Sequence, residues 1–144
     1  MIKNLKEFKL DLEHFHKVVV PETHLELQKK IVITLHRFVV AGSPDGAPGT
    51  PHDWNWARSN WAIAIGSEAP KNDPGPRKRV PLKQDNKAAS EAMRALAKAK
   101  PFQILWVYNN VPYIEALEDG HSKQAPVGMV ETALNSLQTV IDNL

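Results

Sequence analysis

Proline and glycine are concentrated in two stretches of this 144-residue chain, and they limit where regular structure can form. Residues 42–52 contain three glycines and three prolines, and residues 67–87 contain four prolines. Helices and strands do not tolerate that density, so both stretches are expected to be flexible loops. The second stretch also holds six basic residues against three acidic ones, which is typical of exposed chain.

Helical periodicity is clear on the amino-terminal side of these loops. Apolar residues at steps of three and four predict an amphipathic helix over residues 3–17 (Leu5, Phe8, Leu12 and Phe15). Three valines and Pro21 are expected to interrupt it, because proline disfavours a helical conformation in the preceding residue. A second helix is predicted over about residues 22–40, with Thr23 and Glu26 at the spacing of a capping box.

The remaining elements follow the first loop. Residues 61–66 and 102–110 have the apolar, aromatic and β-branched content of strands, and a further strand around Val80 stays open. Helices are predicted over residues 87–100, 112–118 and 128–144. The predicted fold is a single α+β domain over residues 1–144. Its small, mostly antiparallel sheet packs against amino-terminal, central and carboxy-terminal amphipathic helices.

Composition excludes several classes of protein. The chain has no cysteine, which rules out disulfides, thiol nucleophiles and cysteine-ligated metals. Its net charge of +2 is too weak to imply a nucleic-acid partner by itself. The sequence shows neither a signal peptide nor the run of about 18 apolar residues that suggests a membrane span. We therefore expect a soluble protein of the cytoplasm that contacts no membrane.

Catalytic and metal-binding patterns are also missing. His14 and His16 are two residues apart and would point to different faces of a helix, and no HExxH sequence occurs. Asp119, His121 and Ser122 resemble a triad only in sequence, since a triad is defined by its spatial geometry. The sequence has no GxSxG, GxGxxG or Walker motif. We expect no enzymatic activity, no cofactor and no metal site.

Two groups of residues are candidates for contacts with partners. Trp54 and Trp56 lie in a loop-like context, where exposed aromatic side chains favour an interface. The basic residues of the second loop could contact phosphates or an acidic protein surface, and a merely solvated loop is the alternative (Arg77, Lys78, Arg79, Lys83 and Lys87).

The segment NNVPYIEALEDGHSKQAPVGMV, residues 109–130, closely resembles a family signature. It is similar to the tail-completion, or neck, proteins of long-tailed phages, which include head–tail connector proteins and the minor tail protein Z of phage lambda. The matching residues are Asn109, Asn110, Pro112, Tyr113, Leu117, Glu118, Gly120, Ser122, Gln124, Ala125, Pro126, Gly128, Met129 and Val130. A second, weaker match comprises Thr50, Pro51, Asp53, Arg58, Asn60 and Trp61, whereas Asn55 and Trp56 replace the usual threonine and glycine.

The resemblance implies a non-catalytic structural protein of the virion, assembled in the host cytoplasm, that makes tails competent to join heads. It implies a ring of copies, of which six is the expected number, that meets the tail terminator, the tail tube or the head-closure protein. Candidate interface residues are Trp54, Trp56 and Arg58 together with the HSKQA loop (His121, Ser122, Lys123 and Gln124). An equal alternative is that the 109–130 motif only fixes the fold.

Two other functions stay open. The chain could be the tail terminator that caps the tube. It could instead hold the genome end at the neck, with Arg77, Lys78, Arg79 and Lys83 on the DNA.

Overall fold

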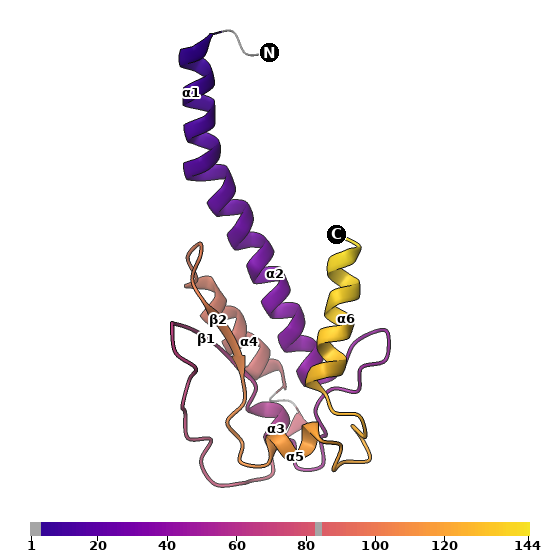
Figure 1. Ribbon diagram of the computed structural model, residues 1–144. Helices are drawn as coiled ribbons and strands as arrows, with labels where there is room; N and C mark the ends of the chain where they lie inside the picture. Colours follow the sequence, from indigo (N-terminus) through magenta and orange to yellow (C-terminus); the bar gives the residue numbers. More distant parts are fainter. Residues whose placement is uncertain (1–3, 83–84) are drawn as a thin grey trace.

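A long helical rod opens the computed structural model, which describes residues 4–82 and 85–144. The rod consists of α1 (Leu5–His14), a π-helical turn η1 (Phe15–Val19) and α2 (Val20–Ala41), and in Figure 1 it rises well beyond the rest of the molecule. Asn4 caps its start, because the Asn4 side chain accepts a hydrogen bond from the Glu7 backbone N–H at 2.9 Å. Gly42, with a φ of 89°, ends it.

The predicted interruption before Pro21 is wrong. Val20 keeps helical angles, with φ −64° and ψ −50°, and its N–H donates to the Phe15 carbonyl one residue further back than in an α-helix. The wider π turn accommodates the ring and the missing N–H of Pro21, which an α-helical interior tolerates poorly. The capping box is also wrong, since α2 begins at Val20 without a side-chain cap.

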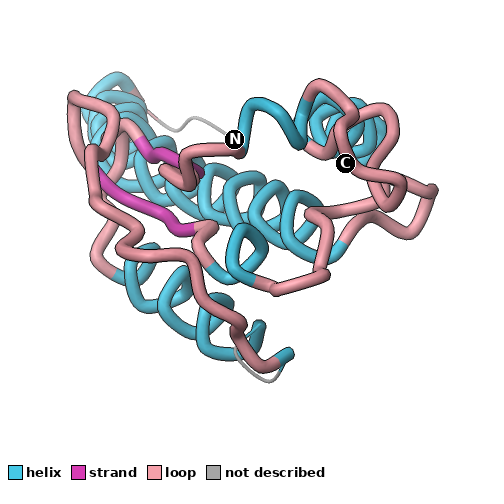
Figure 2. The backbone as a smooth tube through the Cα atoms, turned by 90° about the horizontal axis from the view of Figure 1, so that it is seen from below, coloured by secondary structure: helices cyan, strands magenta, loops and turns pink. Residues whose placement is uncertain are grey.

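The sheet has two antiparallel strands, β1 (Ala62–Ile65) and β2 (Leu105–Tyr108), with Ala62 opposite Tyr108. Between them in sequence lies α4 (Asp85–Ala97). Ile63 of β1 is buried with Ala92 and Leu96 of α4, and side chains of α2 pack against this cluster. The sheet therefore lies against α2 and α4, and Figure 2 shows its strands beside these helices. This confirms the predicted α+β class.

The larger core lies where the carboxy-terminal half of α2 meets α6 (Val130–Asp142). Phe38 and Val39 of α2 are buried there with Met129 and Leu137. Two short helices, α3 (Trp56–Ser59) and α5 (Ile114–Glu118), lie at the base of the molecule below this junction (Figure 1). The junction thus gathers segments from both ends of the chain.

The two proline-rich stretches contain no helix or strand over residues 42–52 and 67–81. Val80 is buried with Trp56 and Val111, and its N–H donates to the Trp54 carbonyl at 2.9 Å. It belongs to no strand, so within the described residues the sheet keeps two strands. The buried Val80 side chain instead anchors the basic loop on the core.

Candidate assembly site

The HSKQA loop after α5 lies against the segment that follows Thr50. Gln124 Nε2 donates to Asp53 Oδ1 at 2.6 Å, and Gln124 Oε1 accepts from the His52 backbone N–H at 2.9 Å. Since 72 residues separate Gln124 from His52, this contact joins distant parts of the chain. The two stretches that carry the phage resemblance therefore share one surface.

A buried hydrogen-bonded chain supports this surface from behind. Thr50 Oγ1 donates to the Val39 carbonyl at 2.6 Å and accepts from Trp61 Nε1 at 2.7 Å. His36 Nε2 lies 3.1 Å from the Trp61 carbonyl, and because a carbonyl only accepts, this nitrogen carries the proton. Burial lowers the pKa of His36 below its ordinary value, although the Trp61 carbonyl opposes the shift. Neutral His36 thus helps to fix Trp61, the residue directly before strand β1, on α2.

Glu118 caps helix α6 from a distance in sequence. One carboxylate oxygen accepts from the Met129 and Val130 N–H groups at 2.8 and 2.7 Å, and the other accepts from the Glu131 N–H at 3.0 Å. The free N–H groups and the positive end of the helix dipole both favour a carboxylate at this position. The Leu-Glu part of the motif therefore fixes where α6 begins.

Gly128 brings the backbone close enough for this cap. Its φ is +81°, and a Cβ atom there would lie 2.4 Å from the Glu118 carbonyl oxygen. Only glycine meets both conditions without displacing the Glu118 backbone. The Gly-Met part of the motif and the Leu-Glu part are thus one structural unit.

The two asparagines at the end of β2 hold the neighbouring loops. Asn109 Nδ2 donates to the Ala57 carbonyl at 2.7 Å. Asn110 Nδ2 donates to the carbonyls of Pro70 and Asn72, each at 3.1 Å. The Asn-Asn pair therefore ties α3 and the start of the basic loop to the sheet.

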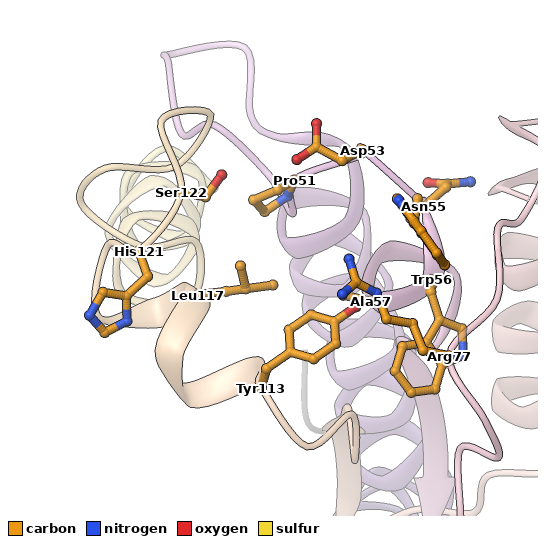
Figure 3. A pocket seen from close by; sticks show the side chains of 11 residues that line it. Pro51, Asp53, Asn55, Trp56, Ala57, Arg77, Tyr113, Leu117, His121 and Ser122 are labelled. Carbon is orange, nitrogen blue, oxygen red and sulfur yellow. The ribbon is translucent and has the colours of Figure 1, made fainter.

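An aromatic and cationic hollow opens beside the joined segments (Figure 3). The Arg77 guanidinium carbon lies 4.5 Å from the Trp54 ring centroid and 5.3 Å from that of Tyr113, both within cation–π range. The hollow has a volume of about 130 Å³, and its wall includes His121 and Ser122. Burial raises the pKa of Tyr113 although the charge of Arg77 opposes it, so the phenol stays neutral and able to donate. The hollow suits a polar side chain of a partner.

The structure gathers most of the predicted interface residues here, with one correction. Trp54 is 40% exposed, as an interface residue should be. Trp56 is only 4% exposed, because it opens α3 and packs on Val80, Val111 and Tyr113. The expectation that Trp56 is an exposed contact residue is therefore wrong.

The other residues of the predicted interface lie at the surface. His121, Lys123 and Gln124 are exposed, whereas Ser122 and Arg58 are half-buried. Ser122 Oγ accepts from the Gln124 N–H at 3.3 Å, which shapes the turn. The positive φ of this region, 57°, belongs to Asn55, an amino acid that adopts it more readily than tryptophan does.

Two arginines of the second loop lie beside the same hollow. Arg77, Lys78 and Arg79 are exposed, and Arg79 also faces the Trp54 ring at 5.9 Å. Lys83 lies outside the described residues. Arg77 and Arg79 therefore adjoin the predicted protein-contact surface, whereas Lys87 lies in α4 with its ammonium 3.8 Å from the Glu91 carboxylate.

Some features of the site had no signal in the sequence. The capping role of Glu118 was missed, since a cap is normally sought within the helix's own first turn.

Among the described residues, no group of three His, Asp or Glu side chains is placed to hold a metal ion. No described helix is long and apolar enough to cross a membrane.

Comparisons with known protein families, with curated proteins and with solved structures gave no match.

Proposed function

We propose that this chain is a structural protein of a phage virion, of the tail-completion or neck type, that makes a tail competent to join a head. The observation that carries the proposal is the contact of Gln124 with His52 and Asp53. It brings the two segments that resemble the family onto one surface, as a shared structural unit requires. The proposal includes no catalytic step.

In the assembled particle, copies of the chain form a ring, with six as the expected number. Trp54 and the HSKQA loop supply contacts to a neighbouring copy, the tail terminator, the tail tube or the head-closure protein. The exposure of Trp54 and of the HSKQA loop supports this role. The hydrogen bonds of buried Thr50 and the Glu118 cap hold the backbone beneath them in place. Such a surface loses little conformational entropy when a partner binds.

The test is a head–tail joining assay with tails from a phage that lacks this gene. Purified protein is mixed with these tails and filled heads, and infectious particles are counted. Particles should appear only when the protein is added. Equal numbers without it would contradict the proposal.

A matched pair of variants locates the contact surface. Trp54→Ala should lower joining strongly but the midpoint of thermal unfolding only modestly, because 40% of Trp54 is exposed. Val127→Ala, at a 67% exposed position outside the hollow, should leave both unchanged. If Trp54→Ala joins heads as well as the parent protein, the hollow is not the contact.

The tail terminator is the alternative position within the same class. A terminator stops the growth of the tube, so particles without it should carry tails of uncontrolled length. A completion protein acts on tubes that are already finished, so tails without it should have normal length and fail to join. Electron micrographs of the gene-deleted lysate separate the two.

DNA contact is a second candidate function, and the exposure of Arg77, Lys78 and Arg79 on one loop favours it. Each phosphate contact should add about 0.9 to the slope of log affinity against log salt. Fluorescence anisotropy with duplex DNA measures that slope. Lys78→Ala should reduce it by about one unit if the side chain touches DNA. A slope that Lys78→Ala leaves unchanged would remove this residue from any DNA surface.

A further inference from the structure

The amino-terminal part of the rod has an apolar face that no described residue of the chain buries. We name residues 5–19 the arm, and α1 and η1 within it contain no buried residue. Its apolar side chains recur at steps of three and four residues, the spacing of a helix that packs on a partner (Leu5, Phe8, Leu12, Phe15 and Val19). A monomer gains nothing from this stripe, so its regular spacing indicates a docking partner.

The same chain also has an unfilled apolar groove of about 560 Å³. It lies between β2, α5 and the first turns of α6, and its lining includes Trp106, Met129 and Leu134. Glu115 and Glu131 lie at its edge and give it a negative rim. On the arm, Lys9 and His16 flank one side of the apolar stripe when the residues are placed at 100° per residue, and Asp11 flanks the other side. Groove and arm are therefore complementary in polarity, and the Lys9 edge of the stripe is complementary in charge to the negative rim.

The arm cannot reach the groove of its own chain. Leu12 precedes Val39 by 27 positions on one continuous rod, a distance of about 40 Å along the helix. Val39 packs in the same core cluster as Met129, which lines the groove. Figure 1 shows the arm leading away from α5 and the start of α6. Only a second copy brings this stripe to this groove without breaking the rod.

We propose that the arm of one copy docks, by its Leu5–Phe8–Leu12–Phe15 stripe, in the β2–α5–α6 groove of a neighbouring copy. When each copy gives its arm to one neighbour and receives an arm from the other, the contact is heterologous and closes into a ring if the rotation allows. Lys9 of the arm faces the Glu115 and Glu131 rim. This contact is the surface that joins one copy to the next. Its place in a ring rests on the proposed function.

Cross-linking of full-length chains tests the contact, and the absence of native cysteine makes it clean. A Leu12→Cys chain is mixed with a Leu134→Cys chain and treated with a short thiol–thiol cross-linker. The control pair is Leu10→Cys with Val140→Cys, at similarly exposed positions on the same two helices that lie off the stripe and outside the groove. The test pair should give at least about five times more cross-linked heterodimer than the control pair.

Other products of this experiment overturn the proposal. Cross-links mainly between two Leu12→Cys chains would mean that arms pair with one another. A heterodimer yield equal to that of the control pair would mean that the groove receives no arm.

Charge exchange gives an independent readout. Lys9→Glu and Glu115→Lys should each weaken self-association in sedimentation, and the double variant should recover it. Leu12→Asp and Leu134→Asp should each weaken association about tenfold or more, whereas Leu10→Asp should not. A double charge variant that stays as weak as the single variants contradicts the pairing.

Failure of this contact is distinguishable from failure of the proposed function. If cross-linking succeeds and added protein does not restore head–tail joining, the contact stands and the virion role is wrong. If joining is restored and the test pair does not cross-link above its control, the role stands and the contact is wrong.

Discussion

Helices α1 and α6 are both amphipathic, yet the structure holds them in different ways. Helix α6 buries Ala133 and Leu137 against α2 and receives a three-bond cap from Glu118. Helix α1 buries no residue and has only the local Asn4 cap. The periodicity of a helix therefore defines its apolar face but not what covers that face. The chain itself packs on the apolar face of α6, whereas we propose that a neighbouring copy packs on that of α1.

The largest difference between the two helices should appear when apolar side chains are truncated at the start of α6. Met129 has no exposed surface, so Met129→Ala should lower the free energy of unfolding by about 2–5 kcal/mol. Val127→Ala, two residues earlier at an exposed position, should change it by less than about 0.5 kcal/mol. Urea unfolding followed by circular dichroism measures both. Equal losses would show that Met129 is not part of the core.

The cap on α6 should matter next. Glu118→Gln keeps the shape of the side chain but removes the charge that three N–H groups and the helix dipole favour. We expect a loss of about 1–2 kcal/mol in the free energy of unfolding. Glu115→Gln, on the same short helix and exposed, is the matched control. A loss no greater than that of the control would mean that the carboxylate does not cap α6.

Acid should weaken the junction through His36. Burial lowers the pKa of His36 in the folded chain, so between this value and the ordinary pKa near 6.5 the unfolded chain binds more protons. The contribution of neutral His36 to the free energy of unfolding is therefore fully present above about pH 6.5 and is lost as the pH decreases below it. Unfolding measured at pH 7.5 and 5.5 should show this loss in the parent protein and a smaller one in His36→Gln. An equal loss in both would assign the acid sensitivity to other groups.

The smallest effect is expected on the arm. Leu12 is 54% exposed, so Leu12→Ala in dilute, monomeric protein should change the free energy of unfolding by less than about 0.5 kcal/mol. The same change should weaken self-association at higher concentration, because it shortens the apolar stripe. A loss of 2 kcal/mol or more in the monomer would show that the arm packs on its own chain.

The sequence predicted the elements whose pattern is local. The alanine-rich helix around Leu96, the strands around Ile63 and Val107, and the carboxy-terminal helix all lie where their periodicity places them. Their ends differ by a few residues, as usual for helix and strand boundaries. Local propensity and tertiary packing agree in these segments.

Two errors arose where a local rule did not hold, one through backbone geometry and one through packing. A proline normally ends a helix, but the π-helical turn over Phe15–Val19 accommodates Pro21 and the helix continues. Trp56 lies beside a loop and was expected at the surface, but it is buried by Val80 and Val111, which are far from it in sequence. No pattern within a few residues of Trp56 contains the information that Val80 and Val111 bury it.

The sequence named the residues of the candidate site but not how they lie together. The sequence named Gln124 and Asp53 in separate motifs, and their hydrogen bond depends on the path of the intervening chain. The role of Glu118 as a cap also depends on a turn of ten residues that returns to α6. Such long-range pairing needs the fold, because loop geometry sets which backbone groups the side chain reaches.

Hydrogen exchange of the free chain, measured in dilute and in concentrated solution, tests the central comparison most directly. In dilute solution the amides of residues 5–19 should exchange rapidly, whereas those of the buried part of α2 and of α6 should be protected. In concentrated solution the arm should gain protection and the core should change little. Strong protection of the arm in dilute, monomeric protein would contradict the account, because the arm would then need no neighbour.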